Sequence, residues 1–337
     1  MKPFRFVYLV LMLIVMGFSF SCTKEQEITA TEISSDGAID FRGGRGEPDA
    51  SDPQGPTIVD IAVSLPDFSV LVDAVVRAGL VDALSAAGPY TVFAPTNDAF
   101  DAFLSANGFS SIDDVPVDLL TTVLTTHVLA GEFFAANIST GYFNTLAAGP
   151  GATQTDIYVQ KTSGVSINGN INVIAADVDA SNGVIHVIDA VIAPSDIVTL
   201  AASNPNFSIL VEALTRPDLS IDFIGALSGA GPLTVVAPTN DAFINLLNSN
   251  PAWNSLNDIP ADVLESVLLY HVAGGNLTSS FLLRSPQVNT LLSGSSWTTS
   301  ILGGLRVVAA SNTAGIIATD VQAQNGVIHA IDTVILP

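Results

Sequence analysis

The side chains to weigh first for catalysis or metal binding are the histidines, because the imidazole ring titrates near neutral pH and ligates metals. The chain has four of them, His127, His186, His271 and His329. Two follow predicted helices, and two lie among Val and Ile in predicted strands. No second His or Cys stands nearby to complete the ligand spacing of a zinc site. We therefore expect four buried structural rings, whose nitrogens bond backbone groups.

Other patterns that carry chemistry are also incomplete. Segment 177–183, Asp-Val-Asp-Ala-Ser-Asn-Gly, alternates oxygen-bearing side chains like a calcium loop. Its glycine comes one position late and no bidentate Glu follows, so a turn into the closing strand is the better interpretation. A Gly-x-Ser-x-Gly elbow and a phosphate-binding glycine loop are absent from the sequence. The sequence therefore predicts no enzyme, no cofactor and no bound metal.

Two polar triplets precede predicted helices. They are Thr96, Asn97, Asp98 and Thr239, Asn240, Asp241. The Asn-Asp pairs could act as an acid and a base, but a partner carboxylate at a fixed spacing is missing. Hydroxyl, amide and carboxylate groups at such a place cap the free N–H groups of a helix. We interpret both triplets as structural caps.

These segments belong to a sequence that occurs twice. Block 88–100, GPYTVFAPTNDAF, returns at 231–243 as GPLTVVAPTNDAF, and block 182–189, NGVIHVID, returns at 325–332 as NGVIHAID. Both offsets are 143 positions. A period of that length is too long for a solenoid unit and matches a whole domain. The sequence thus predicts a tandem of two homologous domains.

Each repeat is expected to place helices first and strands last. Segment 68–76 has apolar residues at helical spacing, and 90–94 is a short apolar run that predicts a strand. Segment 184–192 is apolar on both alternating faces, which is typical of a strand covered on both sides. This order favours an α+β fold. We expect the two domains over 57–194 and 195–337.

The duplicated blocks and a central histidine in each copy resemble the fasciclin (FAS1) domain family, over roughly residues 57–337. The resemblance implies a β-sandwich or wedge flanked by several α-helices in each domain, and an extracellular adhesion module without a general catalytic mechanism. In animal members, a Tyr-His pair at the central position is associated with cell adhesion. The candidate adhesion residues are therefore Tyr270, His271 and His127. Core positions are the alternative, because their neighbours are apolar.

The N-terminal residues 1–21 are typical of a secretory signal peptide. A positively charged start precedes the uncharged apolar run 7–18, which is short for a bilayer of about 30 Å. The following Ser19-Phe20-Ser21-Cys22 resembles a bacterial lipobox, which implies cleavage before Cys22 and lipid attachment to its sulfur. An uncleaved anchor helix is the alternative. Cys22 is the only cysteine in the chain.

Residues 22–56 are predicted to be the lipidated cysteine and a disordered tether, because Gly, Pro, acidic and hydroxyl residues dominate there. Segment 24–27, Lys-Glu-Gln-Glu, resembles an acidic sorting signal of surface lipoproteins. We expect the protein in the cell envelope, anchored to the outer membrane by lipid alone and displayed at the surface. The periplasmic face is the alternative.

The charge balance limits the partners. The chain has 10 Lys and Arg against 32 Asp and Glu, a net charge of −22. Nucleic acid is repelled by this balance, and anionic membranes are disfavoured. We expect adhesion or extracellular-matrix interaction with an extracellular protein or polysaccharide. One alternative is a glycan or small-ligand binding module of an envelope uptake system. Such a module commonly has a pocket lined by aromatic residues, but Trp253 and Trp297 are the only tryptophans in the sequence. Another alternative is a hydrolase, which would need a polar cleft.

Overall fold

The computed structural model describes residues 55–284 and 287–337. These residues lie within one compact unit, Arg45–Pro337. The predicted signal peptide 1–21, Cys22 and the tether as far as residue 54 lie outside the described residues.

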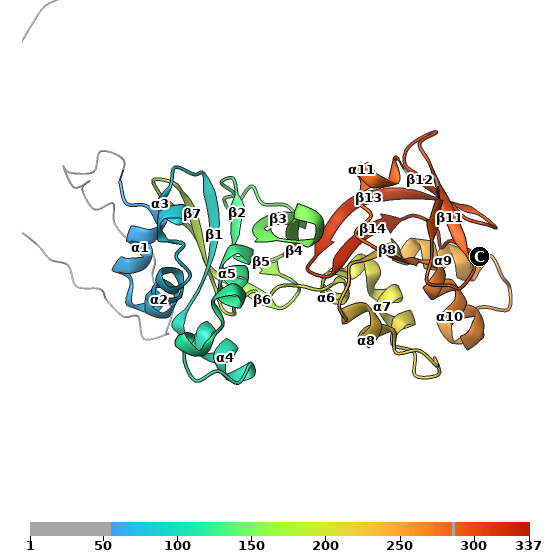
Figure 1. Ribbon diagram of the computed structural model, residues 1–337, viewed down its shortest axis with the longest axis horizontal. Coiled ribbons are helices and arrows are strands. Elements are labelled where there is room, and N and C mark those ends of the chain that lie inside the picture. Colours follow the sequence, from blue (N-terminus) through green and yellow to red (C-terminus); the bar gives the residue numbers. More distant parts are fainter. Residues whose placement is uncertain (1–54, 285–286) are drawn as a thin grey trace, which may run out of the picture. The chain divides into compact units, whose positions relative to one another are not determined.

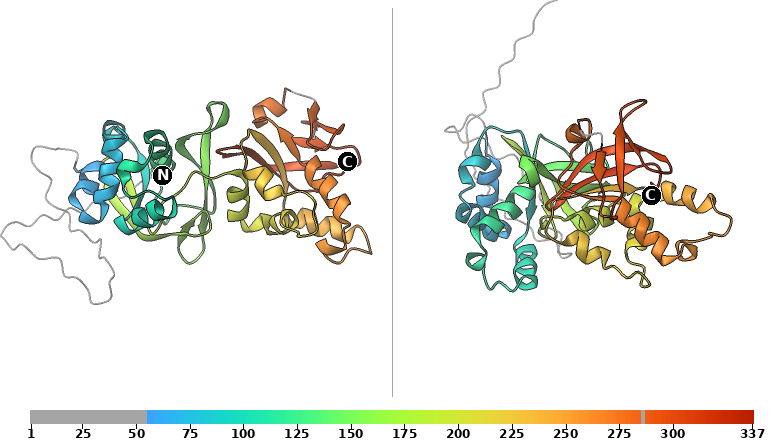
Figure 2. Two further views of the ribbon diagram at one scale, coloured as in Figure 1. Left: turned by 60° about the horizontal axis from the view of Figure 1, so that its bottom comes forward. Right: turned by 45° about the vertical axis from the view of Figure 1, so that its right-hand side comes forward.

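In the first repeat, helices gather on one side of a closed barrel of strands (Figures 1 and 2). The helices are α1 (Ile58–Ser64), α2 (Ser69–Arg77), α3 (Val81–Ser85), α4 (Asn97–Ala106) and α5 (Val117–Thr126). The strands are β1 (Tyr90–Pro95), β2 (Val128–Ala130), β3 (Gly141–Ala148), β4 (Gln154–Lys161), β5 (Val165–Ile167), β6 (Ile171–Ala180) and β7 (Gly183–Ile188). They pair in sequence order, and β7 returns to β1 as a parallel neighbour.

The second repeat has the same order of elements, apart from one additional short helix, α11. Its helices are α6 (Ile197–Ser203), α7 (Ser208–Leu214), α8 (Phe223–Ser228), α9 (Asn240–Asn248), α10 (Ala261–Tyr270) and α11 (Ser279–Leu282). Its strands are β8 (Leu233–Pro238), β9 (Val272–Gly274), β10 (Gln287–Asn289), β11 (Ser296–Ser300), β12 (Arg306–Val308), β13 (Thr313–Ala323) and β14 (Gly326–Ile331). The strand order is β10-β11-β12-β13-β14-β8-β9, and helices α7, α8 and α10 lie on one side of the strands (Figure 1).

The duplicated blocks form the parallel strand pair at the centre of each repeat. Strand β1 pairs with β7, and β8 pairs with β14, in the same register. All six residues of β7 and of β14 are buried, which explains why both alternating faces are apolar. The predicted α+β fold with two homologous repeats is therefore confirmed. Strand β7 ends at Ile188, four residues earlier than the sequence indicates.

The polar triplets divide their roles between capping and tertiary contact. Thr96 accepts a hydrogen bond from Ala99 N at 3.3 Å and caps α4, and Thr239 caps α9 in the same way. The next residue does not cap. The Oδ1 atom of Asn97 accepts from Val70 N at 3.0 Å, and its Nδ2 donates to Pro66 O at 3.0 Å. Asn97 therefore ties α4 to the start of α2, which differs from the predicted cap.

The same departure occurs in the second repeat. Asn240 Oδ1 accepts from Ile209 N at 3.0 Å, and its Nδ2 donates to Pro205 O at 2.9 Å. Asp98 and Asp241 lie in the first turns of α4 and α9, where a negative charge interacts favourably with the helix dipole.

Side chains of the two repeats also hydrogen-bond to each other. Gln322 on β13 is buried, although its counterpart in the first repeat, Asp179, is exposed. Gln322 N donates to Asp156 Oδ2 at 2.7 Å, and Gln322 Oε1 accepts from Thr153 Oγ1 at 3.0 Å. Asn276 Nδ2 donates to Pro150 O at 2.8 Å. The contact between the repeats thus explains why this position differs in an otherwise duplicated segment.

Within residues 55–284 and 287–337, no single helix has the length and apolar composition to cross a membrane. One bent pair, 197–203 with 205–214, passes that test by length and composition only.

Candidate functional site

His127 and His271 stand at the C-terminal ends of α5 and α10, and both rings are buried. His127 Nδ1 lies 2.7 Å from Val123 O, and its Nε2 accepts from Ile192 N at 2.9 Å. Since a carbonyl oxygen only accepts and a backbone N–H only donates, Nδ1 carries the proton. The equivalent partners of His271 are Val267 O at 2.7 Å and Ile335 N at 3.1 Å. Burial lowers the pKa of both rings to about 4.

His186 and His329 lie in β7 and β14 and take the opposite tautomer. His186 Nε2 lies 2.8 Å from Phe133 O and donates to it, while Nδ1 accepts from Asp177 N at 3.2 Å. The partners of His329 are Leu277 O at 2.9 Å and Asp320 N at 3.2 Å. Burial lowers the pKa of both rings. The Asp177 carboxylate is 3.9 Å from His186 Nδ1, but no ion pair forms because that nitrogen is unprotonated.

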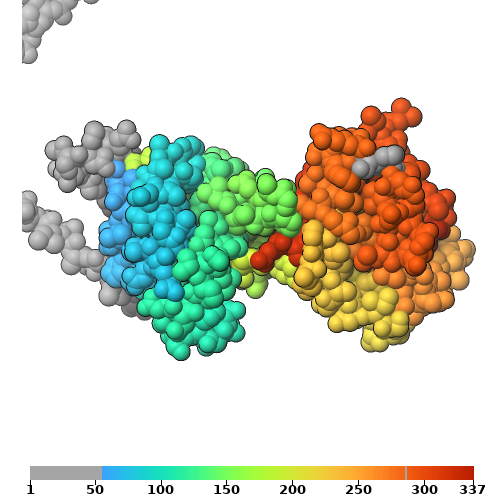
Figure 3. All heavy atoms as spheres, viewed as in Figure 1, coloured from blue at the N-terminus to red at the C-terminus, as the bar shows by residue number. Residues whose placement is uncertain are grey.

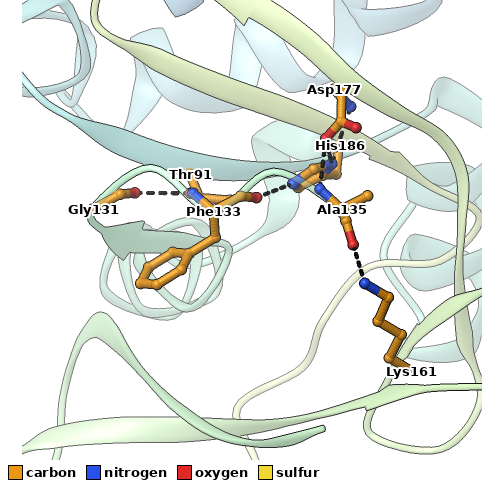
Figure 4. A network of polar contacts seen from close by, with 7 residues as sticks. All are labelled: Thr91, Gly131, Phe133, Ala135, Lys161, Asp177 and His186. Atoms are coloured by element: carbon orange, nitrogen blue, oxygen red, sulfur yellow. Dashed lines mark hydrogen bonds and ion pairs between the residues drawn. The ribbon is translucent and has the colours of Figure 1, made fainter. Parts of the chain in front are cut away.

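The chain that follows β2 is held by the buried hydroxyl of Thr91 on β1 (Figure 4). Thr91 Oγ1 donates to Gly131 O at 2.8 Å and accepts from Phe133 N at 2.9 Å. Phe133 O then accepts from His186, so the ring and the hydroxyl fix the same loop. In the second repeat, Thr234 Oγ1 likewise donates to Gly275 O at 2.6 Å. A polar arrangement that occurs in both repeats at the same positions is typical of hydrogen bonds that hold a loop in place.

Asp177 on β6 also hydrogen-bonds to this loop (Figure 4). Its Oδ1 accepts from Ala135 N at 2.7 Å, and Lys161 Nζ donates to Ala135 O at 2.7 Å. The backbone of Asp177 has a φ of 63°, at a bulge where the pairing of β6 with β7 shifts register. The predicted turn over 177–183 was therefore wrong for residues 177–180, which belong to β6. The described part of the chain contains no group of three or more potential metal-binding side chains.

The Tyr-His pair is part of the core of the second repeat. Tyr270 is 1% exposed; its hydroxyl donates to Ser296 O at 2.9 Å and accepts from Ala310 N at 3.2 Å. Thr126, at the equivalent place in the first repeat, instead donates to Thr122 O within its own helix. Both members of the pair are inaccessible to a partner in this conformation. Their adhesive role, like that of His127, stays a prediction.

An exposed apolar turn was missed by the sequence analysis. Ile301 and Leu302, between β11 and β12, are 69% and 85% exposed. Gly303 and Gly304 follow with positive φ angles of 76° and 108°, which glycine adopts without strain. The corresponding turn of the first repeat, 162–164, is Thr-Ser-Gly. The signal was present in the sequence as two apolar residues directly before Gly-Gly, a pair that by itself is typical of a turn.

Two apolar side chains of α11 and its C-terminal flank are also exposed. Phe281 and Leu283 are exposed, and Thr299 Oγ1 on β11 donates to Leu282 O at 2.7 Å, which places α11 beside the strand that leads into the turn. We call the set Phe281, Leu283, Ile301 and Leu302 the hairpin patch. Large exposed apolar patches mark interaction surfaces more often than single exposed apolar residues do.

Comparison with known proteins places these observations in a family. The fasciclin domain profile matches residues 66–194 and 205–337. "Protein sll1483" of Synechocystis is 47% identical over 138 residues, which are 41% of this chain and 73% of that protein. The cell surface glycolipoprotein MPB83 of Mycobacterium bovis is 33% identical over 150 residues, 43% of this chain and 62% of that protein. The transforming growth factor-beta-induced protein ig-h3 of Sus scrofa is 28% identical over 255 residues, 74% of this chain and 35% of that protein.

A solved structure is also similar, the FAS1 domain pair of the insect cell adhesion molecule fasciclin I. It is 19% identical with a TM-score of 0.46, and the match covers 79% of this chain and 95% of that one. The profile by itself covers both repeats and the greater part of the chain. The chain belongs to the fasciclin domain family, with two domains in tandem.

Proposed function

We propose that this protein is a non-catalytic adhesion protein of a bacterial cell envelope, held by a lipid on Cys22. In this proposal the second domain binds an extracellular protein through the hairpin patch. The observation that carries it is the exposure of Ile301 and Leu302 at the tip of a turn. Apolar side chains at such a tip bury their surface in a pocket of a partner, and a few such residues supply most of the binding energy of an interface.

The chemistry of the histidines supports the non-catalytic part of the proposal. A general base needs a free lone pair within reach of a substrate, and a nucleophile needs such a base beside it. In all four rings both nitrogens are hydrogen-bonded to backbone groups, and all four are buried. Protonating any ring would replace an accepted hydrogen bond by a repulsive contact between two donors. These rings therefore hold loops in place.

One further observation favours a protein partner over a glycan, and two others concern the location of the protein and the source of affinity. Glycan sites commonly present an aromatic face, but Trp297 is 1% exposed and Trp253 packs against the core of the second domain. The name of one relative, a cell surface glycolipoprotein, supports placement at the surface. Electrostatic steering toward an anionic partner is unfavourable at a net charge of −22, so apolar contact is left as the main source of affinity.

The experiment is attachment of the protein to surfaces coated with extracellular proteins. The test variant carries Ile301→Ser with Leu302→Ser, and the control carries Ile174→Ser, because Ile174 is 54% exposed in the first domain. Burying one such side chain is worth about 1.5–3 kcal/mol, so we expect the double variant to bind at least about tenfold more weakly. The control should bind like the wild type, and all three should unfold alike. Equal attachment of the double variant and the wild type contradicts the proposal.

A further inference from the structure

The first domain contains an apolar cavity of about 120 Å³ beneath its N-terminal helices. The helices α1, α2, α3 and α5 and the strand β1 line it, and the blue-to-cyan residues of α1 to α3 form an outer face of this domain in Figure 3. Val72, Val75 and Leu84 are among the lining side chains, and His127 is the single polar residue in the lining. Both nitrogens of His127 are already hydrogen-bonded to Val123 and Ile192.

Water is a poor occupant of this space. A buried water needs two to four polar partners, and the lining offers none that is free. Apolar cavities of about 150 Å³ stay dry and bind benzene or xenon. The volume here is of the same order, so a small apolar group gains dispersion contacts that the lining otherwise lacks.

The second domain shows that the fold does not require this cavity. At the equivalent place it leaves only about 20 Å³. One cause is the substitution of Val75 by the larger Leu214 at the same position of the helix. Another is the helix above the space: α8 buries Phe223 and Leu227, while α3 buries none of its residues, although Leu84 of α3 is the counterpart of Leu227. The first domain therefore has a smaller residue on α2 and a less buried helix above the space than its own duplicate.

The cavity continues to the surface over an apolar rim. Val63 and Val76 line it and are 63% and 60% exposed. The equivalent residues of the second domain are Ala202 and Thr215, which are smaller or more polar. A compact cyclic ligand such as benzene would fill the cavity but leave this apolar rim exposed to solvent. A linear hydrocarbon that enters the cavity with one end covers the rim with the methylene groups that follow.

We infer that the first domain binds the end of a linear hydrocarbon chain belonging to an uncharged amphiphile. The lining includes no charged side chain that would recognise an ionic headgroup, and the net charge of −22 disfavours an anionic one. This site is in the first domain and is independent of the hairpin patch in the second. A variant that abolishes binding at one of these two sites therefore leaves binding at the other measurable.

The test uses the full chain and 1-octanol as the probe, observed by NMR through nuclear Overhauser contacts from the octanol methyl group. We expect contacts to the methyl groups of Val75 and Leu84, and a saturable change in their chemical shifts. The variant Val75→Leu introduces the residue of the second domain, and we expect it to lose at least about tenfold in affinity. The reciprocal Leu214→Val should gain a weak octanol site in the second domain.

A rim variant keeps the test decisive if Val75→Leu is poorly folded. Val76→Thr changes an exposed residue to its counterpart in the second domain, and the loss of one covering methyl group should weaken octanol binding about fourfold. Phosphatidylcholine vesicles form a second arm, run with the chain from residue 22 onward and Cys22→Ala in every protein so that the proposed lipid anchor does not itself hold the protein on the bilayer; this arm distinguishes the chains of a bilayer from a free amphiphile. If the vesicles retain the protein with the wild-type cavity but not the Val75→Leu variant, the bound hydrocarbon chain is that of a bilayer lipid. Absence of octanol contacts in the wild type, or unchanged affinity in both variants, overturns the inference.

Discussion

The backbone N–H of Gln322 in the second domain donates to the carboxylate of Asp156 in the first, at 2.7 Å. The other carboxylate oxygen accepts from Asn144 Nδ2 at 2.6 Å. Burial nevertheless dominates and raises the pKa of Asp156 to about 7, because removing the charged form from water costs more than these hydrogen bonds return. A contact between the domains thus contains a carboxyl group that titrates near neutral pH.

We predict that Asp156 makes the stability of the protein decrease as the pH rises. Between the unfolded pKa of 3.8 and the folded pKa of about 7, the folded state binds more protons, so the free energy of unfolding falls with rising pH. The slope is at most about 1.4 kcal/mol per pH unit. Denaturant unfolding of the wild type and Asp156→Asn across this range measures it as the difference between the two curves. A flat difference between the wild type and Asp156→Asn would contradict the prediction.

The buried histidines should give the opposite sign. For His127 and His271 the folded pKa is about 4 and the unfolded value is 6.5, so the unfolded state binds more protons in between. Their contribution is present above pH 6.5 and is lost as the pH falls toward 4, by at most about 1.4 kcal/mol per pH unit for each ring. Titration of the ring signals by NMR checks this directly. A midpoint near 6.5 for either ring would show that it is not buried in solution.

The tautomers of the histidines are a separate prediction. His127 and His271 should carry the proton on Nδ1, and His186 and His329 should carry it on Nε2, because each ring faces one carbonyl oxygen and one backbone N–H. Two-bond ¹H–¹⁵N correlation spectra at pH 7 distinguish the two forms. Finding the same tautomer in all four rings would disprove the hydrogen-bond assignment given above.

The substitution His186→Ala should destabilise the first domain without affecting attachment through the second. It leaves Phe133 O and Asp177 N without their ring partner and creates a cavity, so we expect a loss of about 1–3 kcal/mol from the polar groups alone. Thermal unfolding beside the attachment assay measures both effects. A variant of full stability that fails to attach would mean that the ring serves binding after all.

The lipid anchor is predicted from Cys22, which lies outside the described residues. Replacing it by Ala should remove metabolic labelling by fatty acids and release the protein from the membrane fraction, because no other cysteine is available for thioether attachment. Ser21→Ala keeps a small residue at the cleavage site and serves as the control, with labelling retained. Persistent labelling of Cys22→Ala is the result that would rule out this anchor.

The duplicated blocks determined the central strands of both domains and the caps Thr96 and Thr239, because hydrophobic pattern and capping act over a few neighbouring residues. The sequence also indicated buried, hydrogen-bonded histidines. The bounds 57–194 and 195–337, the partner and the adhesive residues stay predictions.

Only the tertiary structure decided which groups meet across long stretches of chain. The ring of His186 finds Phe133, 53 residues away, and Asn97 finds Pro66 rather than its own helix end. Comparison of the two repeats shows that Gln322 replaces Asp179 and that Leu302 replaces a residue of a polar turn. It does not show that Gln322 is buried against Asp156, nor that Leu302 is exposed. Local pattern specifies an element and its apolar face. Burial of a particular side chain depends on which distant element covers it, and that is set by the packing of the whole fold.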